Sequence, residues 1–173
     1  MGEGTDEALR AFEMLGKFLE EGGWYPQETE EDLLLYRVTL AGEGGEMVGF
    51  AEIEPEFELL IFYLYAPLEV PHERRAAAAE YITRANYGMW IGNFELDYED
   101  GEVRFKSSVH YEGTTLTEPL IRNAIQDALQ AMEEYLPGLR DVIEGRALPA
   151  EAIAAVETAD SVETTDSAET DEG

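Results

Sequence analysis

The sequence predicts a single α+β domain built on an antiparallel five-stranded sheet, with the element order α-β-β-β-α-β-β-α. Three observations support this prediction. The chain of 173 residues has the size of one domain. Its apolar fraction of 45% is sufficient for a sizeable core. Helical and strand periodicities alternate in that order along the chain, and glycine, proline or capping residues separate them.

The first half predicts one helix and three strands. Helical spacing of apolar residues over 5–21 ends at a Gly-Gly pair, which is typical of a helix C-terminus. Residues 33–40 alternate between apolar and polar, and a second strand is predicted over residues 47–53 after a glycine-rich turn. The third strand, residues 57–65, is apolar on both faces. This pattern predicts a central strand that is covered on each side.

The second half predicts two helices around a hairpin. Pro71 begins a helix that extends to Tyr87, and its run of four alanines permits close approach by a neighbouring element. Thr117 is expected to cap the long third helix. We expect Pro137-Gly138 to break that helix, so that short helical segments follow over 139–144 and 149–157.

The side chains of the hairpin between residues 89 and 111 predict which residues of its two strands pair with each other. Asp100-Gly101 is a strong signal for a two-residue turn. That turn pairs Leu96 with Phe105, Tyr98 with Val103, Gly92 with Val109 and Trp90 with Tyr111 on the apolar face. On the polar face it pairs Asp97 with Arg104 and Glu95 with Lys106. Apolar and opposite-charge pairs both follow from this one register.

The chain divides into a domain over residues 1–157 and an acidic tail over residues 158–173. The tail contains many carboxylates and almost no large apolar side chains. Because such a segment has little surface to bury, we expect it to be disordered.

The charge excludes some classes of partner. The chain has 39 acidic and 11 basic residues, a net charge of −28. This charge repels nucleic acid and anionic lipid, so we expect no direct binding to nucleic acid or to a membrane. It is consistent with solubility in a salty cytoplasm and also with recognition of a basic protein surface, and both interpretations stay open. The chain has no cysteine and no long apolar segment, which makes the cytoplasm the expected location.

No motif predicts a catalytic residue, a cofactor or a metal. The carboxylates around Gly101 resemble a calcium loop only superficially, because the glycine lies one position too late and the flanking residues have strand character. His72 and His110 lie far apart in the sequence and are expected to face solvent. We therefore expect a protein that is not an enzyme.

The stretch Arg84 to Lys106, RANYGMWIGNFELDYEDGEVRFK, resembles the signature of the YbjN family, bacterial proteins described as candidate regulators of sensory transduction. Further similarity lies in Ala66-Pro67, in MEEYLPGL at 132–139 and in PAEAI at 149–153, so the resemblance covers residues 8–157. The family is similar in fold to type III secretion chaperones, which dimerise and bind extended segments of other proteins. The resemblance thus implies a dimeric, protein-binding, non-enzymatic regulator or chaperone-like adaptor.

Two groups of residues are the candidates for binding a partner protein. They are Leu60, Phe62 and Leu64 of the third strand, and Arg74, Arg75 and Arg84 of the second helix. The apolar group offers surface beyond what a small core needs. The three arginines, together with Arg104 and Lys106 of the hairpin, either neutralise neighbouring acids or form a cationic island that orients a partner on a negative molecule. Two alternatives stay open: an anionic mimic that binds the basic groove of a nucleic-acid-binding protein, and an enzyme with unrecognised carboxylate chemistry.

Overall fold

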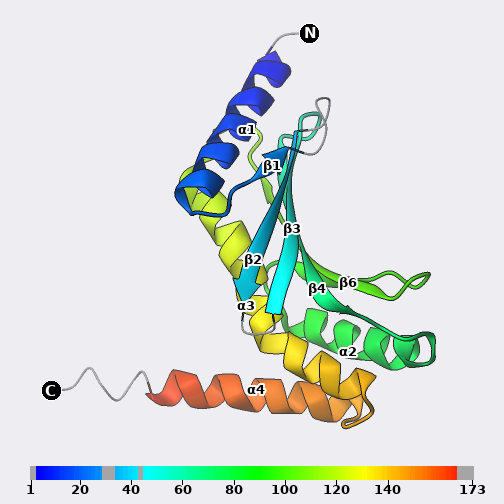
Figure 1. Cartoon of the computed structure of the whole chain (residues 1–173). Coiled ribbons are helices and arrows are strands. Elements are labelled where there is room, and N and C mark those ends of the chain that lie inside the picture. Colours follow the sequence, from blue (N-terminus) through cyan, green and yellow to red (C-terminus); the bar gives the residue numbers. More distant parts are fainter. Residues whose placement is uncertain (1–2, 29–33, 43–44, 167–173) are drawn as a thin grey trace, which may run out of the picture.

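The computed structural model describes residues 3–28, 34–42 and 45–166. It contains one antiparallel sheet in the strand order β1-β2-β3-β4-β6-β5, with its helices on one side (Figure 1). The elements are α1 (Glu3–Glu21), β1 (Gln27–Glu28), β2 (Leu35–Gly42), β3 (Gly45–Glu54), β4 (Leu59–Glu69), the short 3-10 helix η1 (His72–Arg74), α2 (Arg75–Gly88), β5 (Asn93–Leu96), β6 (Glu102–His110), α3 (Glu118–Ile143) and α4 (Pro149–Asp166).

The predicted fold class and element order are confirmed. The five expected strands are β2 to β6, and β1 adds a short sixth strand beside β2, where Gln27 pairs with Arg37. The periodicity of residues 33–40 is also confirmed, because Tyr36, Val38 and Leu40 point into the core.

The core lies between the helices and one face of the sheet. Leu15 and Leu19 of α1 and Ile121 of α3 are completely buried. They pack in one cluster with Phe62 of β4 and Phe105 of β6. Since α1 and α3 both contact this face, the amphipathic patterns of helices and strands meet in a single apolar layer.

Helix α3 does not end at Pro137-Gly138, so the predicted break is wrong. The helix continues to Ile143, and Leu136 and Leu139 on either side of the pair are buried. Tyr81 of α2 donates its hydroxyl hydrogen to the Tyr135 carbonyl at 2.8 Å. A Cβ atom at position 138 would lie 2.5 Å from the Tyr81 hydroxyl oxygen, so the glycine admits this ring. The burial of Leu136 and Leu139 and the contact with Tyr81 therefore offset the loss of the helical hydrogen bond that the proline nitrogen cannot donate.

The hairpin turn is longer than predicted. Asp97 N donates to Glu102 O at 2.8 Å, and Gly101 N donates to Asp97 O at 2.9 Å, so a four-residue loop over 98–101 replaces the two-residue turn. Phe94 pairs with Phe105, Leu96 with Val103 and Glu95 with Arg104. This register differs from the predicted one by two residues, which leaves every side chain on its predicted face. Residues 89–92 precede β5 and are not part of the sheet.

Two further expectations differ from the structure. Thr117 occupies the N-cap position of α3, but its side chain makes no capping hydrogen bond. Helix α4 extends to Asp166 and so includes residues 158–166 of the predicted tail. Extending a helix that has already formed is favourable, because each added residue contributes one further backbone hydrogen bond. The Thr158 hydroxyl Oγ1 also donates a hydrogen bond to the Ala154 carbonyl at 2.6 Å. The remaining tail, residues 167–173, lies outside the described residues.

Candidate protein-binding face of the sheet

The two faces of β4 have different surroundings. Leu60, Phe62 and Leu64 are at most 1% exposed under the helices. A partner could not reach these three side chains in this structure. The hypothesis that Leu60, Phe62 and Leu64 bind a partner protein is therefore replaced by their role in the core. Ile61 and Tyr63 on the opposite face are half-buried, and the helices that contact the sheet all lie on the other side. The expectation that β4 is covered on both sides is wrong for the same reason.

The uncovered side of the sheet forms the surface that we call the open face. It consists of Leu35, Arg37 and Thr39 from β2, Val48, Phe50 and Glu52 from β3, Ile61, Tyr63 and Tyr65 from β4, Arg104 and Lys106 from β6, and Glu95 from β5. Register places Phe50 beside Tyr63 and Val48 beside Tyr65. Phe50 and Tyr65 are in edge-to-face contact, with ring centroids 5.5 Å apart. An apolar, aromatic strip therefore occupies the centre of the open face.

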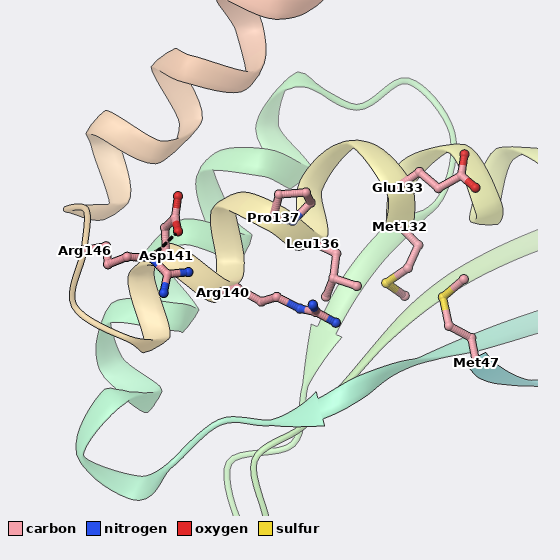
Figure 2. A pocket seen from close by; sticks show the side chains of 8 residues that line it. All are labelled: Met47, Met132, Glu133, Leu136, Pro137, Arg140, Asp141 and Arg146. Carbon is pink, nitrogen blue, oxygen red and sulfur yellow. Dashed lines mark hydrogen bonds and ion pairs between the residues drawn. The ribbon is translucent and has the colours of Figure 1, made fainter. Parts of the chain in front are cut away.

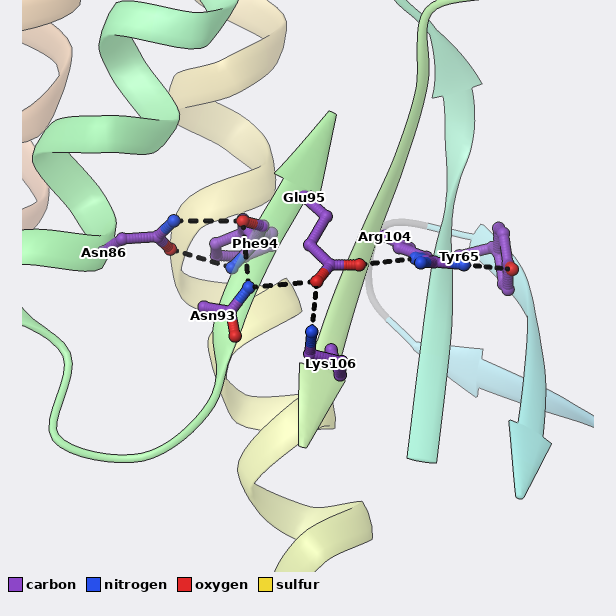
Figure 3. Close-up of polar contacts among 7 residues, drawn as sticks. All are labelled: Tyr65, Asn86, Asn93, Phe94, Glu95, Arg104 and Lys106. Carbon is purple, nitrogen blue, oxygen red and sulfur yellow. Dashed lines mark hydrogen bonds and ion pairs between the residues drawn. The ribbon is translucent and has the colours of Figure 1, made fainter. Parts of the chain in front are cut away.

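Charged residues from the hairpin border this strip (Figure 3). Arg104 Nε donates to Glu95 Oε2 at 2.8 Å, and its Nη1 donates to the Tyr65 hydroxyl at 3.1 Å. The Arg104 guanidinium also lies 4.3 Å from the centre of the Tyr63 ring. Lys106 donates to the other oxygen of Glu95. One carboxylate thus orients two cations, and one of these cations holds two tyrosines in place.

The contacts of the network keep Glu95 and Arg104 charged at neutral pH. Partial burial raises the pKa of Glu95, but hydrogen bonds from Lys106 and Arg104 outweigh it, so the pKa lies below its ordinary value. Burial lowers the pKa of Arg104, but its bonds to Tyr65 and Glu95 leave it raised. Burial likewise raises the pKa of Tyr63, so its hydroxyl stays protonated. Two cations, Arg104 and Lys106, therefore lie beside Glu95 on a molecule with a net charge of −28, and Asp97 and Glu102 line one hollow with Arg104.

The outer edge of β5 is blocked by a side chain. Asn86 of α2 accepts a hydrogen bond from Phe94 N at 2.8 Å and donates one to Phe94 O at 3.0 Å (Figure 3). The amide imitates a neighbouring strand and occupies the backbone groups that another chain would pair with. The backbone groups of Phe94 are therefore not available for pairing with a further strand at this edge.

The three arginines of the sequence hypothesis make contacts within the domain. Arg75 donates from Nε to the Val70 carbonyl at 3.2 Å and from Nη1 to the carbonyls of Tyr98 and Glu99 at 2.9 and 3.0 Å. It therefore fixes the hairpin loop to the start of α2. Arg84 pairs with Glu80 at 2.8 Å. Arg74 packs beside Gly145 in the turn that precedes α4. None of the three lies on the open face.

The acidic residues of the hairpin are also engaged. Asp97 Oδ1 accepts a hydrogen bond from Glu99 N at 2.7 Å, and Asp100 Oδ1 accepts one from Glu102 N at 2.9 Å. These bonds stabilise the loop, and within the described residues no group of three or more acidic or histidine side chains could hold a metal ion. His72 and His110 are exposed, as predicted.

A pocket of about 310 Å³ lies on the helical side of the molecule, between α3 and the start of β3 (Figure 2). Its described lining consists of Met47, Met132, Glu133, Leu136, Pro137, Arg140, Asp141 and Arg146. The two methionines and Leu136 form a buried apolar floor. Arg146 at the rim pairs with Asp141 at 2.7 Å. The polar part of the described lining consists of two carboxylates, Glu133 and Asp141, and two guanidinium groups, Arg140 and Arg146.

Sequence reasoning missed Phe50 and Asn86. Successive side chains of a strand point to opposite faces, so the position of Phe50 in β3 showed only that it lies on the face opposite Ala51. Asn86 had no recognisable signal, because its role depends on an edge strand eight residues later. The tyrosines of β4 were visible in the sequence, but their exposure was not.

The fold and this face define an α+β protein with helices on one side of an antiparallel sheet and an aromatic surface on the other. The chain belongs to the YbjN family, whose model matches residues 11–141 and has the description "Putative bacterial sensory transduction regulator". Among solved structures, the chain is similar to one titled "Crystal structure of YbjN, a putative transcription regulator from E. coli". The TM-score is 0.53 at 13% identity, over 73% of this chain and 91% of the other, so this likeness concerns the fold. No curated protein matches the chain significantly. Among the described residues, no helix is long and apolar enough to cross a membrane.

Proposed function

We propose that this chain is a non-enzymatic regulator that acts as a homodimer and binds segments of partner proteins on its open face. The aromatic strip of Phe50, Tyr63 and Tyr65 is the observation that supports this proposal. These side chains are only half-buried, whereas their neighbours on the other face of the same strands are completely buried. Aromatic residues are enriched at protein interfaces because they bury a large area with little loss of side-chain entropy.

The Arg104 network favours binding by keeping the strip in one conformation. The guanidinium contacts both tyrosines and is itself held by Glu95. A surface that is already ordered loses less conformational entropy when a partner binds. The network also leaves cations beside the strip, which favours a partner segment that combines apolar residues with a carboxylate.

A protein is the partner class that the charge supports. Membership of a family described as sensory transduction regulators supports a role in which the chain contacts another macromolecule. The net charge of −28 disfavours direct contact with nucleic acid, even beside the local cations of the open face.

Site-specific photo-crosslinking of the full chain would test this proposal. A photoreactive residue replaces Tyr63 on the open face or, as a control, Leu148, which is 65% exposed in the turn before α4. We expect position 63, and not position 148, to capture a defined protein from a native lysate. The purified captured protein should then bind the wild type and lose affinity for Tyr63→Asp. Equal capture from both positions would contradict a binding role for the open face.

The second candidate function is an anionic mimic, and the net charge of −28 is the observation that favours it. Salt distinguishes the two. Binding through the aromatic strip should persist in 0.5 M salt, because burial of apolar surface is not screened. Ionic recognition of a basic groove should weaken strongly over the same range, since the Debye length falls to only a few ångströms.

A further inference from the structure

The turn between α2 and β5 exposes three large apolar side chains within five residues. Trp90 is 99% exposed, Tyr87 is 95% exposed and Ile91 is 60% exposed. Trp90 and Tyr87 are the two most exposed large apolar side chains of the described residues. We call residues 87–91 the aromatic turn. Single exposed apolar residues are ordinary on protein surfaces, but a contiguous group marks an interaction site.

The structure holds this turn at both ends. Gly92 has a φ of +72°, and a Cβ atom there would overlap the Phe105 ring. The chain therefore leaves the sheet at this residue, and Trp90 cannot take the place opposite Tyr111 that its sequence position predicted. On the other side, the two hydrogen bonds of Asn86 fix the end of α2 to Phe94. The aromatic turn projects from two fixed points, which limits the entropy lost on binding.

The turn is also the part of the chain with the least negative charge. Residues 81–94 contain no aspartate or glutamate, and this is the longest such stretch in the sequence. Arg84 is its one charged residue and pairs with Glu80. Two copies of a chain with a charge of −28 repel each other over most approaches, and here the repulsion is smallest.

We infer that the aromatic turn is the surface through which two copies of this chain associate, with Trp90 and Tyr87 of each copy packed against the same turn of the other. A symmetric contact sets one acid-free patch against the other acid-free patch, so that no carboxylate of these residues becomes buried. The inference rests on the proposed homodimer and adds its location. It leaves the open face of both copies free for partner segments.

The size of the patch predicts how strongly the copies bind. Each tyrosine or tryptophan buries about 150–250 Å². Two such side chains from each of two copies bury roughly 600–1,000 Å², at the low end of specific interfaces. We therefore expect a weak dimer that becomes stronger as salt screens the remaining charge.

Sedimentation equilibrium of the full chain at low and high NaCl concentration would test the inference. The wild type should associate more tightly at high salt. Trp90→Ala and Tyr87→Ala should each raise the dissociation constant at least about tenfold, because buried aromatic residues dominate small interfaces. Phe57→Ala is the matched control, since Phe57 is 61% exposed in the distant turn between β3 and β4. Its dissociation constant should equal that of the wild type.

Fluorescence provides an independent readout. The chain has two tryptophans, so Trp24→Phe leaves Trp90 as the only reporter. Its emission should shift to shorter wavelength as protein concentration or salt rises. Thermal melts should show that Trp90→Ala folds like the wild type, because the exposed indole has almost no contacts to lose.

Several results would overturn this inference, and they differ from failure of the proposed function. If the dissociation constants of both Trp90→Ala and Tyr87→Ala equal that of the wild type, the aromatic turn is not the dimer interface. Loss of association in Tyr63→Asp alone would retain the dimer and assign it to the open face. A monomer at every concentration would exclude the dimer itself, while photo-crosslinking would still report on partner binding. A monomer whose Trp90 emission shifts with phosphatidylcholine vesicles would assign the turn to a lipid surface.

Discussion

The two faces of the sheet are built from alternate residues of the same strands. On the covered face, Leu60, Phe62 and Leu64 are removed from solvent, and α3 contacts their strand directly. On the open face, Ile61, Tyr63 and Tyr65 are equally bulky but remain partly in contact with water. The covered side chains have no hydrogen-bonding atom, whereas the two tyrosines on the open face have hydroxyl groups, and one of these bonds Arg104. Amphipathic aromatic residues thus let the open face combine apolar area with polar groups that contact water.

The largest expected effect tests this difference directly. Phe62→Ala should reduce the free energy of unfolding by about 3–5 kcal/mol, because it leaves a cavity in the covered layer. Tyr63→Ala, one residue away, should reduce it by only about 1 kcal/mol, since its site is already half-exposed. Urea denaturation of both variants measures the two values. Similar losses would show that the open face is part of the core, and the comparison between the faces would fail.

The second prediction concerns the loop that holds the charged border of the open face. Gly101 has a φ of +89°, and a Cβ atom there would overlap the Val70 carbonyl oxygen. Gly101→Ala should therefore cost about 3 kcal/mol, through both backbone strain and the clash. Gly113→Ala is the matched control, because its φ of +76° is similar and no atom lies within 4 Å of the added Cβ. It should cost only about 1 kcal/mol.

Glu99→Gln in the same loop separates the structural interpretation from a calcium site. Glu99 is exposed, and its backbone takes part in the loop contacts with Arg75 and Asp97. The variant should melt like the wild type with calcium or with a chelator. A wild type that gains several degrees on addition of calcium, with the gain absent from Glu99→Gln, would contradict the structural interpretation.

The fourth prediction is a difference in pH dependence. The pKa of Glu95 is lowered, so its ion pairs stabilise the fold above the ordinary value of 4.5, and this contribution is lost as the pH falls through the lowered pKa. Glu95→Gln should cost about 1 kcal/mol at pH 7 and nothing in strong acid. Burial and Asp100 raise the pKa of Glu102, so Glu102→Gln should instead stabilise the fold at pH 7. Denaturation of both variants between pH 7 and pH 3 checks the opposite signs.

A small effect is also expected from removal of the C-terminal segment. Deleting residues 158–173 removes many carboxylates and almost no large apolar side chains. The melting temperature should change by less than about 2 °C, because almost no apolar burial is lost. A drop of more than a few degrees would show that the end of α4 contributes to the packing of the covered side.

Local patterns were enough to predict much of the fold. The alternation of Tyr36, Val38 and Leu40 identified a strand and its buried face, and the turn glycine Gly101 was correctly placed at positive φ. The hairpin register was two residues off, because Arg75 holds the carbonyls of a longer loop. That contact joins residues more than twenty positions apart and has no local signal.

The sequence by itself determined the order of the elements, the family and the side of each strand to which a residue belongs. These properties depend on spacing between near neighbours, which the chain specifies before it folds. Only the tertiary structure decided which face of β4 is covered, that α3 continues past Pro137, and that Trp90 leaves the sheet at Gly92. Each of these depends on contacts between distant segments, namely the helices on β4, Tyr81 on α3 and Phe105 at Gly92. Equally apolar faces are indistinguishable until one of them acquires its helices.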